Sequence, residues 1–173
     1  MFHFTIKAYI RDLTNLRAIL EKAKLWQVEH KIADETIMNA RLALDQFSLA
    51  GQVRSACNFA RNSGAVIRGL DSPSYEDNEK TLTDLQGRVD RVISYLKEVT
   101  EESIVTDLDT RTVPLAWMPG KCLIARYFLE VYAHSNFYFH YTTAYSILRH
   151  YGLAIGKGDY IGHVEIHDIP QQS

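Results

Sequence analysis

Apolar residues recur at steps of three and four along the first part of the chain, which is the spacing of one face of an α-helix. The first run predicts a long amphipathic helix over residues 4–27. After a polar link, Asp34 is placed to cap a short helix, because a carboxylate accepts hydrogen bonds from the unpaired N–H groups of a first turn. The apolar positions of the first helix are Ile6, Ile10, Leu13, Leu16, Leu20 and Ala23.

Two more runs of this kind predict two further long helices. Ser48 suits the N-cap of one, and Gly69 suits its end, because glycine adopts a positive φ without a Cβ clash. The other begins at Thr81 or Thr83 and tolerates Gly87, which is compatible with close packing. The polar residues 71–80 between them form a predicted solvated loop. The two apolar faces consist of Leu49, Val53, Ala56, Ala60, Gly64 and Ile67, and of Leu82, Leu85, Val89, Val92, Leu96 and Val99.

The segment after the third helix is irregular. Pro114 and Pro119 exclude a continuous helix over residues 100–119, and partial alternation over residues 104–115 favours a short extended piece. A connection of this length is typical of helical bundles that are not simple up-and-down structures. We therefore expect an all-α fold, a four-helix bundle with a long crossover between helices three and four.

The last part of the chain returns to a helical pattern. A short helix is predicted from Leu123 to Val131, followed by a kink or a new cap at His134 and Ser135. The main helix Asn136–His150 is apolar on nearly every side, which is typical of a helix in a core or in an oligomer interface. The glycine-rich residues 152–162 predict a loop, and residues 170–173 a frayed end.

Composition supports one globular domain over residues 1–173. Apolar residues make up 46% and charged residues 23% of the chain, as in ordinary globular proteins. The net charge of -2 argues against nucleic-acid binding, which needs clustered positive charge. No apolar run approaches the ~20 residues that span a membrane. Without a secretory signal, and with Cys57 and Cys122 inside apolar helical patterns, we expect a cytoplasmic protein with buried thiols.

Among the histidines, His140 is the strongest candidate for a functional group. A metal site on one helix needs two strong ligands four residues apart, and the residue four before His140 is Asn136, a poor ligand for zinc or nickel. A buried histidine that is hydrogen-bonded to a neighbour is the favoured interpretation. His163 and His167 share this spacing, but an extended segment would place them ~13 Å apart.

The other motifs do not indicate a catalytic or binding site. The glycines at 156 and 158 lack the preceding strand and the Lys-Ser or Lys-Thr pair of a phosphate loop. Asp107 and Asp109 lack the glycine and distal glutamate of a calcium loop. No nucleophile-elbow motif is present, and both cysteines lie in apolar runs that disfavour a reactive thiolate. Whether the protein is an enzyme stays open.

Three stretches together resemble a branch of the DinB/YfiT-like superfamily that has no assigned function. They are Asn136–Gly152 (NFYFHYTTAYSILRHYG), Ile155–Gly162 (IGKGDYIG) and Asn39–Leu42 (NARL) with Gln52 and Cys57. The resemblance covers nearly the whole chain and implies a four-helix bundle with a long crossover, usually as a homodimer. Better-known members bind a divalent metal through three histidines, and some are thiol-dependent transferases or isomerases.

The resemblance places the two histidines of the last helix at Asn136 and His140. The histidine of the second helix falls near Ser55, with Gln52 one turn earlier on a similar face. Because only His140 is a histidine, we expect neither a metal ion nor another cofactor. An amide, a hydroxyl and an imidazole at these positions can instead supply hydrogen bonds to a small ligand.

Three hypotheses follow. The first is a small-ligand-binding bundle with a vestigial metal site made of Gln52, Ser55, Asn136 and His140. The second is a metal- or thiol-dependent enzyme of the transferase or hydrolase type that uses His140. The third is a structural homodimer or interaction protein whose aromatic last helix forms the interface.

Overall fold

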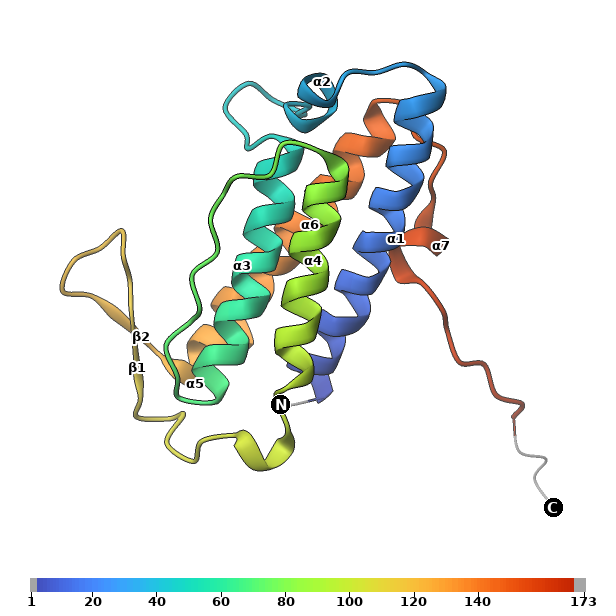
Figure 1. The fold of residues 1–173 in the computed structure, drawn as a ribbon. Coiled ribbons are helices and arrows are strands. Elements are labelled where there is room, and N and C mark those ends of the chain that lie inside the picture. Colours follow the sequence, from blue (N-terminus) through green and yellow to red (C-terminus); the bar gives the residue numbers. More distant parts are fainter. Residues whose placement is uncertain (1–2, 170–173) are drawn as a thin grey trace.

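Four long helices dominate the computed structural model, which describes residues 3–169. They are α1 (Ala8–Glu29), α3 (Leu49–Ile67), α4 (Leu82–Lys97) and α6 (His134–His150), and they lie side by side (Figure 1). Both α1 and α3 pack against α4 and α6. The prediction of a mainly helical protein is confirmed. No helix in the described range is long and apolar enough to cross a membrane.

The helix directions place the long crossover between the second and third of these helices, not between the third and fourth as predicted. In Figure 1, α1 and α6 run one way, whereas α3 and α4 run the other. Because α3 and α4 are parallel neighbours, residues 68–81 run the full length of the molecule to join them. Residues 98–124, which join α4 to α5 (Ala125–Tyr127), stay at one end. They contain η2 (Glu101–Ser103) and the antiparallel pair β1 (Thr112–Pro114) and β2 (Cys122–Ile124).

Two of the predicted N-caps, Ser48 and Thr81, are confirmed. The Ser48 side chain accepts a hydrogen bond from the backbone N–H of Gly51 at the start of α3. Thr81 and Asp84 form a capping box at the start of α4, each accepting from the other's backbone N–H. Asp34 is not a cap: it is the first residue of α2 (Asp34–Met38), and its carboxylate accepts from the Gln27 side chain at 2.9 Å.

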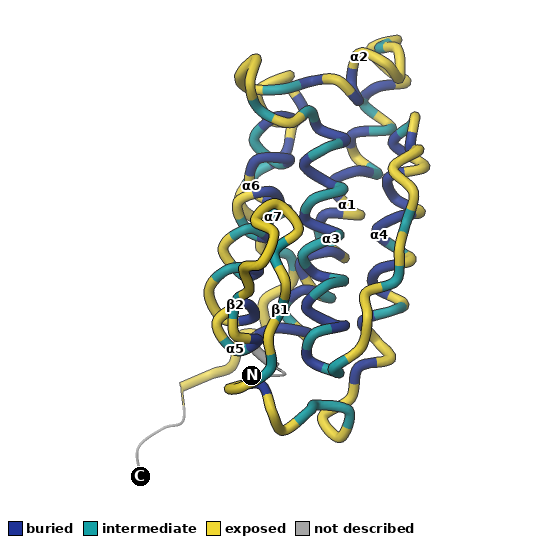
Figure 2. The backbone as a smooth tube through the Cα atoms, turned by 90° about the vertical axis from the view of Figure 1, so that its left-hand side faces the viewer, coloured by how far each residue is buried: buried dark blue, intermediate teal, exposed yellow. Residues whose placement is uncertain are grey.

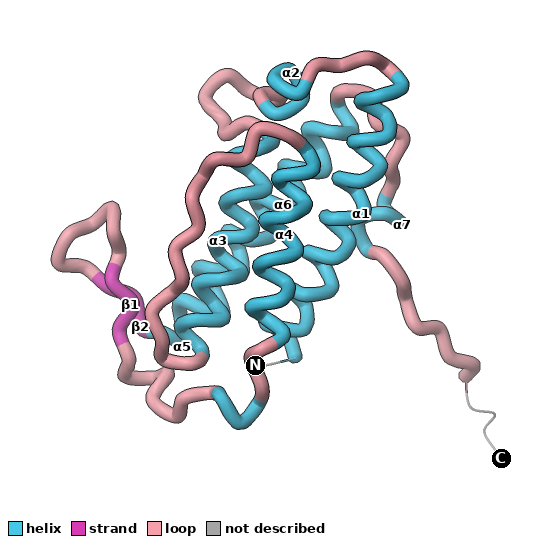
Figure 3. Tube along the Cα trace, in the orientation of Figure 1, coloured by secondary structure: helices cyan, strands magenta, loops and turns pink. Residues whose placement is uncertain are grey.

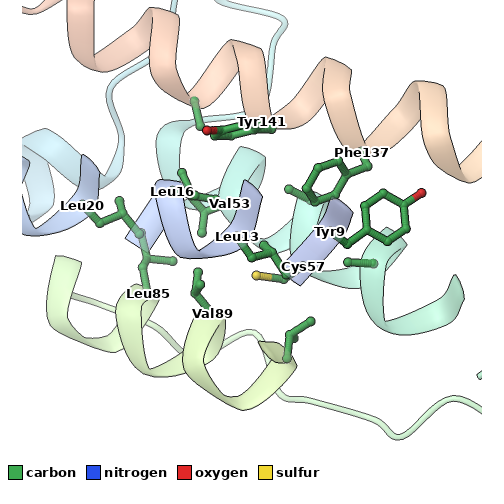
Figure 4. Close-up of a cluster of buried hydrophobic side chains, with 14 of the residues drawn as sticks. Tyr9, Leu13, Leu16, Leu20, Val53, Cys57, Leu85, Val89, Phe137 and Tyr141 are labelled. Carbon is green, nitrogen blue, oxygen red and sulfur yellow. The ribbon is translucent and has the colours of Figure 1, made fainter. Parts of the chain in front are cut away.

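The apolar faces of the four helices meet in one core (Figures 2 and 4). Cys57 is fully buried there, as predicted. Cys122 is exposed, because it belongs to strand β2 and not to a helix. Close-packed side chains in Figure 4 are Tyr9, Leu13, Leu16 and Leu20 of α1, Val53 and Cys57 of α3, Leu85 and Val89 of α4, and Phe137 and Tyr141 of α6.

The loop predicted at residues 71–80 is not wholly solvated. Glu79 is buried, and its two carboxylate oxygens accept from Arg88 at 2.8 Å and from Arg54 at 2.7 Å. The Arg88 guanidinium, which is fully buried, also donates to the backbone carbonyl of Glu76 at 3.1 Å. These bonds hold the long connection against α3 and α4.

The last part of the chain differs from the prediction in three ways. Leu123 lies in strand β2, so the helix begins only at Ala125, while the extended piece predicted before it is confirmed as β1. A π-helical segment, η3 (Phe128–Ala133), joins α5 to α6 without a break, so His134 starts no new cap. The predicted C-terminal loop contains the short helix α7 (Lys157–Ile161), whose Asp159 accepts from the backbone N–H of Gly156. The fraying predicted for residues 170–173 lies outside the described residues.

Candidate functional site

Two of the four predicted site residues meet where α3 packs against α6. Gln52 lies in the first turn of α3 and His140 in the middle of α6. The His140 Nδ1 atom is 2.7 Å from the Gln52 Oε1 atom, and both side chains are buried. This contact joins residues 88 positions apart in the sequence.

The Gln52 amide determines which nitrogen of His140 carries the proton. Its Nε2 group donates to the backbone carbonyl of Phe47 at 3.2 Å, so its Oε1 atom faces the imidazole as an acceptor. The Nδ1 atom must therefore be the donor, and the Nε2 atom of the neutral ring keeps its lone pair. No described residue forms a hydrogen bond with His140 Nε2.

Two phenyl rings enclose the imidazole. The Phe47 ring lies parallel to it at a centroid distance of 6.1 Å, and the Phe59 ring lies parallel to it at 5.8 Å. His140 is 8% exposed, and this burial lowers the pKa of His140 below its usual value of 6.5. The ring is therefore neutral at pH 7, with a lone pair that can accept a hydrogen bond or a proton.

The other two predicted residues, Ser55 and Asn136, do not take part in this contact. Asn136 lies one turn before His140, but its amide donates to the backbone carbonyl of Tyr132 at 2.8 Å. Ser55 follows Gln52 by three residues on α3 and is partly buried. Within residues 3–169, neither side chain is hydrogen-bonded to Gln52 or His140.

This set of donors does not fit the three-histidine metal site that the resemblance implies. The candidate positions offer one imidazole, two amides and a hydroxyl, and amide and hydroxyl oxygens are weak ligands for zinc or nickel. In the described part of the chain, no three His, Cys, Asp or Glu side chains are grouped so that they could hold a metal ion.

The sequence did not identify which aromatic residues line the site. Phe47 lies just before the predicted N-cap Ser48, outside every predicted helix, and Gly51 lets it approach α3, since a Cβ at position 51 would lie 3.0 Å from the Phe47 Cβ. Phe59 could have been predicted from the sequence, because it follows Gln52 by seven residues, or two helical turns, and so lies on the same face of the helix. The stacking of both rings on a residue of α6 depends on the packing of the helices.

Other candidate groups have structural roles. Asp107 pairs with Arg111, and Asp109 pairs with Arg126, so the two aspartates do not share a ligand site. His163 and His167 lie in an exposed segment without regular structure, where His167 is 3.9 Å from Glu165. Burial raises the pKa of Cys57 to about 12, which leaves no thiolate at pH 7.

Comparisons with known proteins agree with this architecture. The family model described as a domain of unknown function (DUF1993) matches residues 1–161. A crystal structure of a DinB family member protein from Shewanella denitrificans is similar, with a TM-score of 0.89 and 35% sequence identity. The match covers 97% of this chain and 95% of that chain. None of the curated proteins matches.

Proposed function

Because this chain belongs to the DUF1993 family of DinB-like domains, whose function is unassigned, we propose that it binds a small molecule at the His140 site. The observation that carries this proposal is the fixed tautomer of His140. A buried, neutral imidazole presents an unpaired Nε2 acceptor between two phenyl rings. Such a combination of apolar walls and one oriented polar group is typical of ligand sites.

The residue chemistry defines what the site accepts. The ligand donates a hydrogen bond to His140 Nε2, because the lone pair of a neutral imidazole can only accept. Ser55 of α3 and Asn136 of α6 complete the proposed site. The side-chain oxygen of Asn136 can accept a hydrogen bond from the ligand, because the side-chain nitrogen is the atom bonded to the backbone carbonyl of Tyr132. The metal site of related proteins is vestigial in this proposal.

Co-purification tests this function. The wild-type protein, His140→Leu and His150→Leu are purified without a tag, and their denatured extracts are compared by mass spectrometry. His150 is the control because it is an exposed histidine of the same helix. We expect a compound that is bound by wild type and His150→Leu and reduced about tenfold in His140→Leu.

Two results would contradict the proposal. One is that no small molecule accompanies the wild-type protein, and the other is that all three proteins carry the compound equally. Circular dichroism of each variant checks that the helices are retained, so that a loss of ligand is not a loss of fold.

An enzyme is the alternative function. His140 Nε2 is unprotonated at pH 7, so it can serve as a general base. Elemental analysis of untagged protein decides the metal-dependent version: a stoichiometric transition metal would support it, and its absence would exclude it.

A homodimer is a second role that one observation favours. Tyr127, Val131 and Phe139 lie on the continuous helix from α5 to α6, and all three side chains are exposed, Phe139 by 55%. Burying such side chains in a symmetric interface would stabilise a dimer. We expect light scattering at micromolar concentration to show a dimer that Phe139→Glu dissociates. Val28→Glu, on the exposed side of α1, serves as the control, and a wild-type monomer would rule out the dimer.

The finer architecture belongs to the same proposal. We assign α1, α3, α4 and α6 to a DinB-like four-helix bundle, residues 68–81 to the long crossover between its second and third helices, and residues 1–173 to one domain. The similarity to the Shewanella protein over nearly the whole chain supports this assignment. Two free cysteines are consistent with a reducing compartment, which favours the cytoplasm.

A further inference from the structure

A cleft of about 440 Å³ lies beside the C-terminal end of α3. One side is formed by α3 and residues 69–72, and the other by strand β1, residues 115–117 and η3. The β1–β2 arm projects from the helices at this end of the molecule (Figure 1). The volume falls within the range of known small-molecule sites.

Four aromatic side chains line this cleft, with Tyr132 at their centre. The Tyr132 ring stacks on Trp117 at a centroid distance of 5.5 Å and an angle of 22°. Phe59 meets Tyr132 edge-on at 5.8 Å, and Phe128 lies at 5.9 Å from it. Trp117 is 59% exposed. Flat aromatic walls with one exposed indole favour a planar ring as the ligand, because offset stacking and edge contacts both reward planarity.

Asn62 gives the cleft an oriented hydrogen-bond donor. Its Oδ1 atom accepts from Ser72 Oγ at 2.7 Å and from an Arg61 guanidinium N–H at 3.3 Å. These two bonds fix the amide so that the Nδ2 group is the free end. No described residue accepts a hydrogen bond from Asn62 Nδ2. A ligand that reaches it must present an acceptor.

The charges around the cleft favour an uncharged ligand. Arg111 is the only lining cation in the described chain, and its guanidinium makes two 3.0 Å contacts with the Asp107 carboxylate. Asp71, also at the rim, adds a negative charge. An anion would therefore find no unpaired positive charge among the residues that line the cleft.

We propose that this cleft binds a planar, uncharged aromatic molecule whose carbonyl oxygen accepts a hydrogen bond from Asn62 Nδ2. The ring packs against Trp117 and Tyr132. The inference goes beyond the ligand at His140 and does not require it, although Phe59 connects the two sites by stacking on the imidazole and lining the cleft.

NMR spectroscopy of the full chain tests this proposal with coumarin as the probe, a flat bicyclic molecule with one carbonyl. The chain has two tryptophans, so ¹⁵N-labelled protein gives two indole N–H signals. We expect coumarin to shift the Trp117 signal saturably and to leave the Trp26 signal unchanged, since Trp26 lies in α1 beside His30. Octahydrocoumarin, which keeps the carbonyl but has no aromatic ring, should bind about tenfold more weakly.

Four variants, one of them a control at His140, test the contacts by ligand-observed saturation transfer. Trp117→Ala should weaken coumarin binding about tenfold, and Trp117→Phe, which keeps an aromatic ring, about twofold. Asn62→Asp retains the two accepted bonds from Arg61 and Ser72 but replaces the donor with an oxygen, and should weaken binding about fivefold. His140→Leu should leave coumarin binding unchanged, which separates this proposal from the function at His140.

Several outcomes would overturn the inference. A Trp117 signal that does not move up to the solubility of coumarin would exclude the site. Equal binding of octahydrocoumarin would show that the cleft does not select planar rings. Unchanged binding by Asn62→Asp would show that the ligand carbonyl does not accept a hydrogen bond from Asn62 Nδ2.

Discussion

His140 illustrates how one neighbouring side chain sets the chemistry of a residue. An isolated imidazole exchanges its proton between two nitrogens, but here Gln52 accepts from Nδ1 and is itself held by the backbone carbonyl of Phe47. The free Nε2 lone pair follows from these two bonds together with burial between Phe47 and Phe59. The proposed ligand contact depends on all of them.

The pH dependence of His140 can be predicted from its burial. Because the pKa of His140 is lowered in the folded protein, the unfolded chain binds more protons between that value and about 6.5. The free energy of unfolding therefore decreases as the pH falls through this interval. We expect the ring signals of His140 in NMR spectra, assigned with His140→Leu, to titrate below pH 6.5.

A second variant checks the cause. Gln52→Glu places a carboxylate beside Nδ1, which stabilises the charged ring and should raise the pKa of His140 above that in the wild-type protein. An apparent pKa at or above about 6.5 in the wild-type protein would mean that the imidazole is not buried as described.

At the scale of the elements, two glycines of neighbouring helices have opposite roles. The sequence marked Gly87 of α4 as compatible with close packing, yet a Cβ there would meet nothing within 4 Å. At Gly64 of α3, a Cβ would lie 2.8 Å from a Leu96 methyl group and 3.1 Å from the Tyr95 ring. The close approach of α3 and α4 therefore depends on Gly64.

Alanine substitutions at the two glycines form a matched pair. Gly87→Ala should raise the free energy of unfolding by about 0.5–1 kcal/mol, because alanine loses less backbone entropy in an exposed helix position. Gly64→Ala gains the same propensity but crowds a buried leucine, so we expect a net decrease of about 1 kcal/mol. Urea unfolding measures both, and a stabilising Gly64→Ala would contradict the described packing.

At the scale of the whole molecule, α7 ties the last helix to the first. The Tyr160 ring stacks on the buried Tyr141 ring of α6 at a centroid distance of 4.3 Å, and the backbone carbonyl of Tyr160 accepts from the Tyr141 hydroxyl. On α1, Asn15 donates to the carbonyls of Tyr160 and Ile161, and Lys22 pairs with Asp159. Helix α7 therefore contacts both α1 and α6.

Two truncations measure this contribution. A chain ending at Gly156 loses α7 and exposes Tyr141, and we expect its free energy of unfolding to fall by about 2–4 kcal/mol. A chain ending at Gly162 keeps α7 and removes a segment whose described residues, 163–169, are exposed. Its thermal midpoint should match that of the full chain. Equal midpoints for both truncations would show that α7 stabilises nothing.

The sequence alone determined the long helices and the N-caps of α3 and α4. Their apolar residues repeat at the helical period, and both Ser48 and Thr81 accept backbone N–H groups within three residues of themselves, so these features need only local chain geometry. The sequence also selected Gln52 and His140 as candidate residues. Gln52 was selected through its helical position and through the family resemblance.

The tertiary structure alone decided what lies between the helices. The Gln52–His140 hydrogen bond spans 88 residues, and Glu79, which is buried and paired with Arg88 of α4, lies in a segment whose polarity indicated solvent. Whether a polar side chain faces water or a partner depends on which helix packs beside it. The spacing of apolar residues along the sequence does not contain that information. For the same reason the cleft at Trp117 becomes visible only when the β1–β2 arm is placed next to α3 and η3.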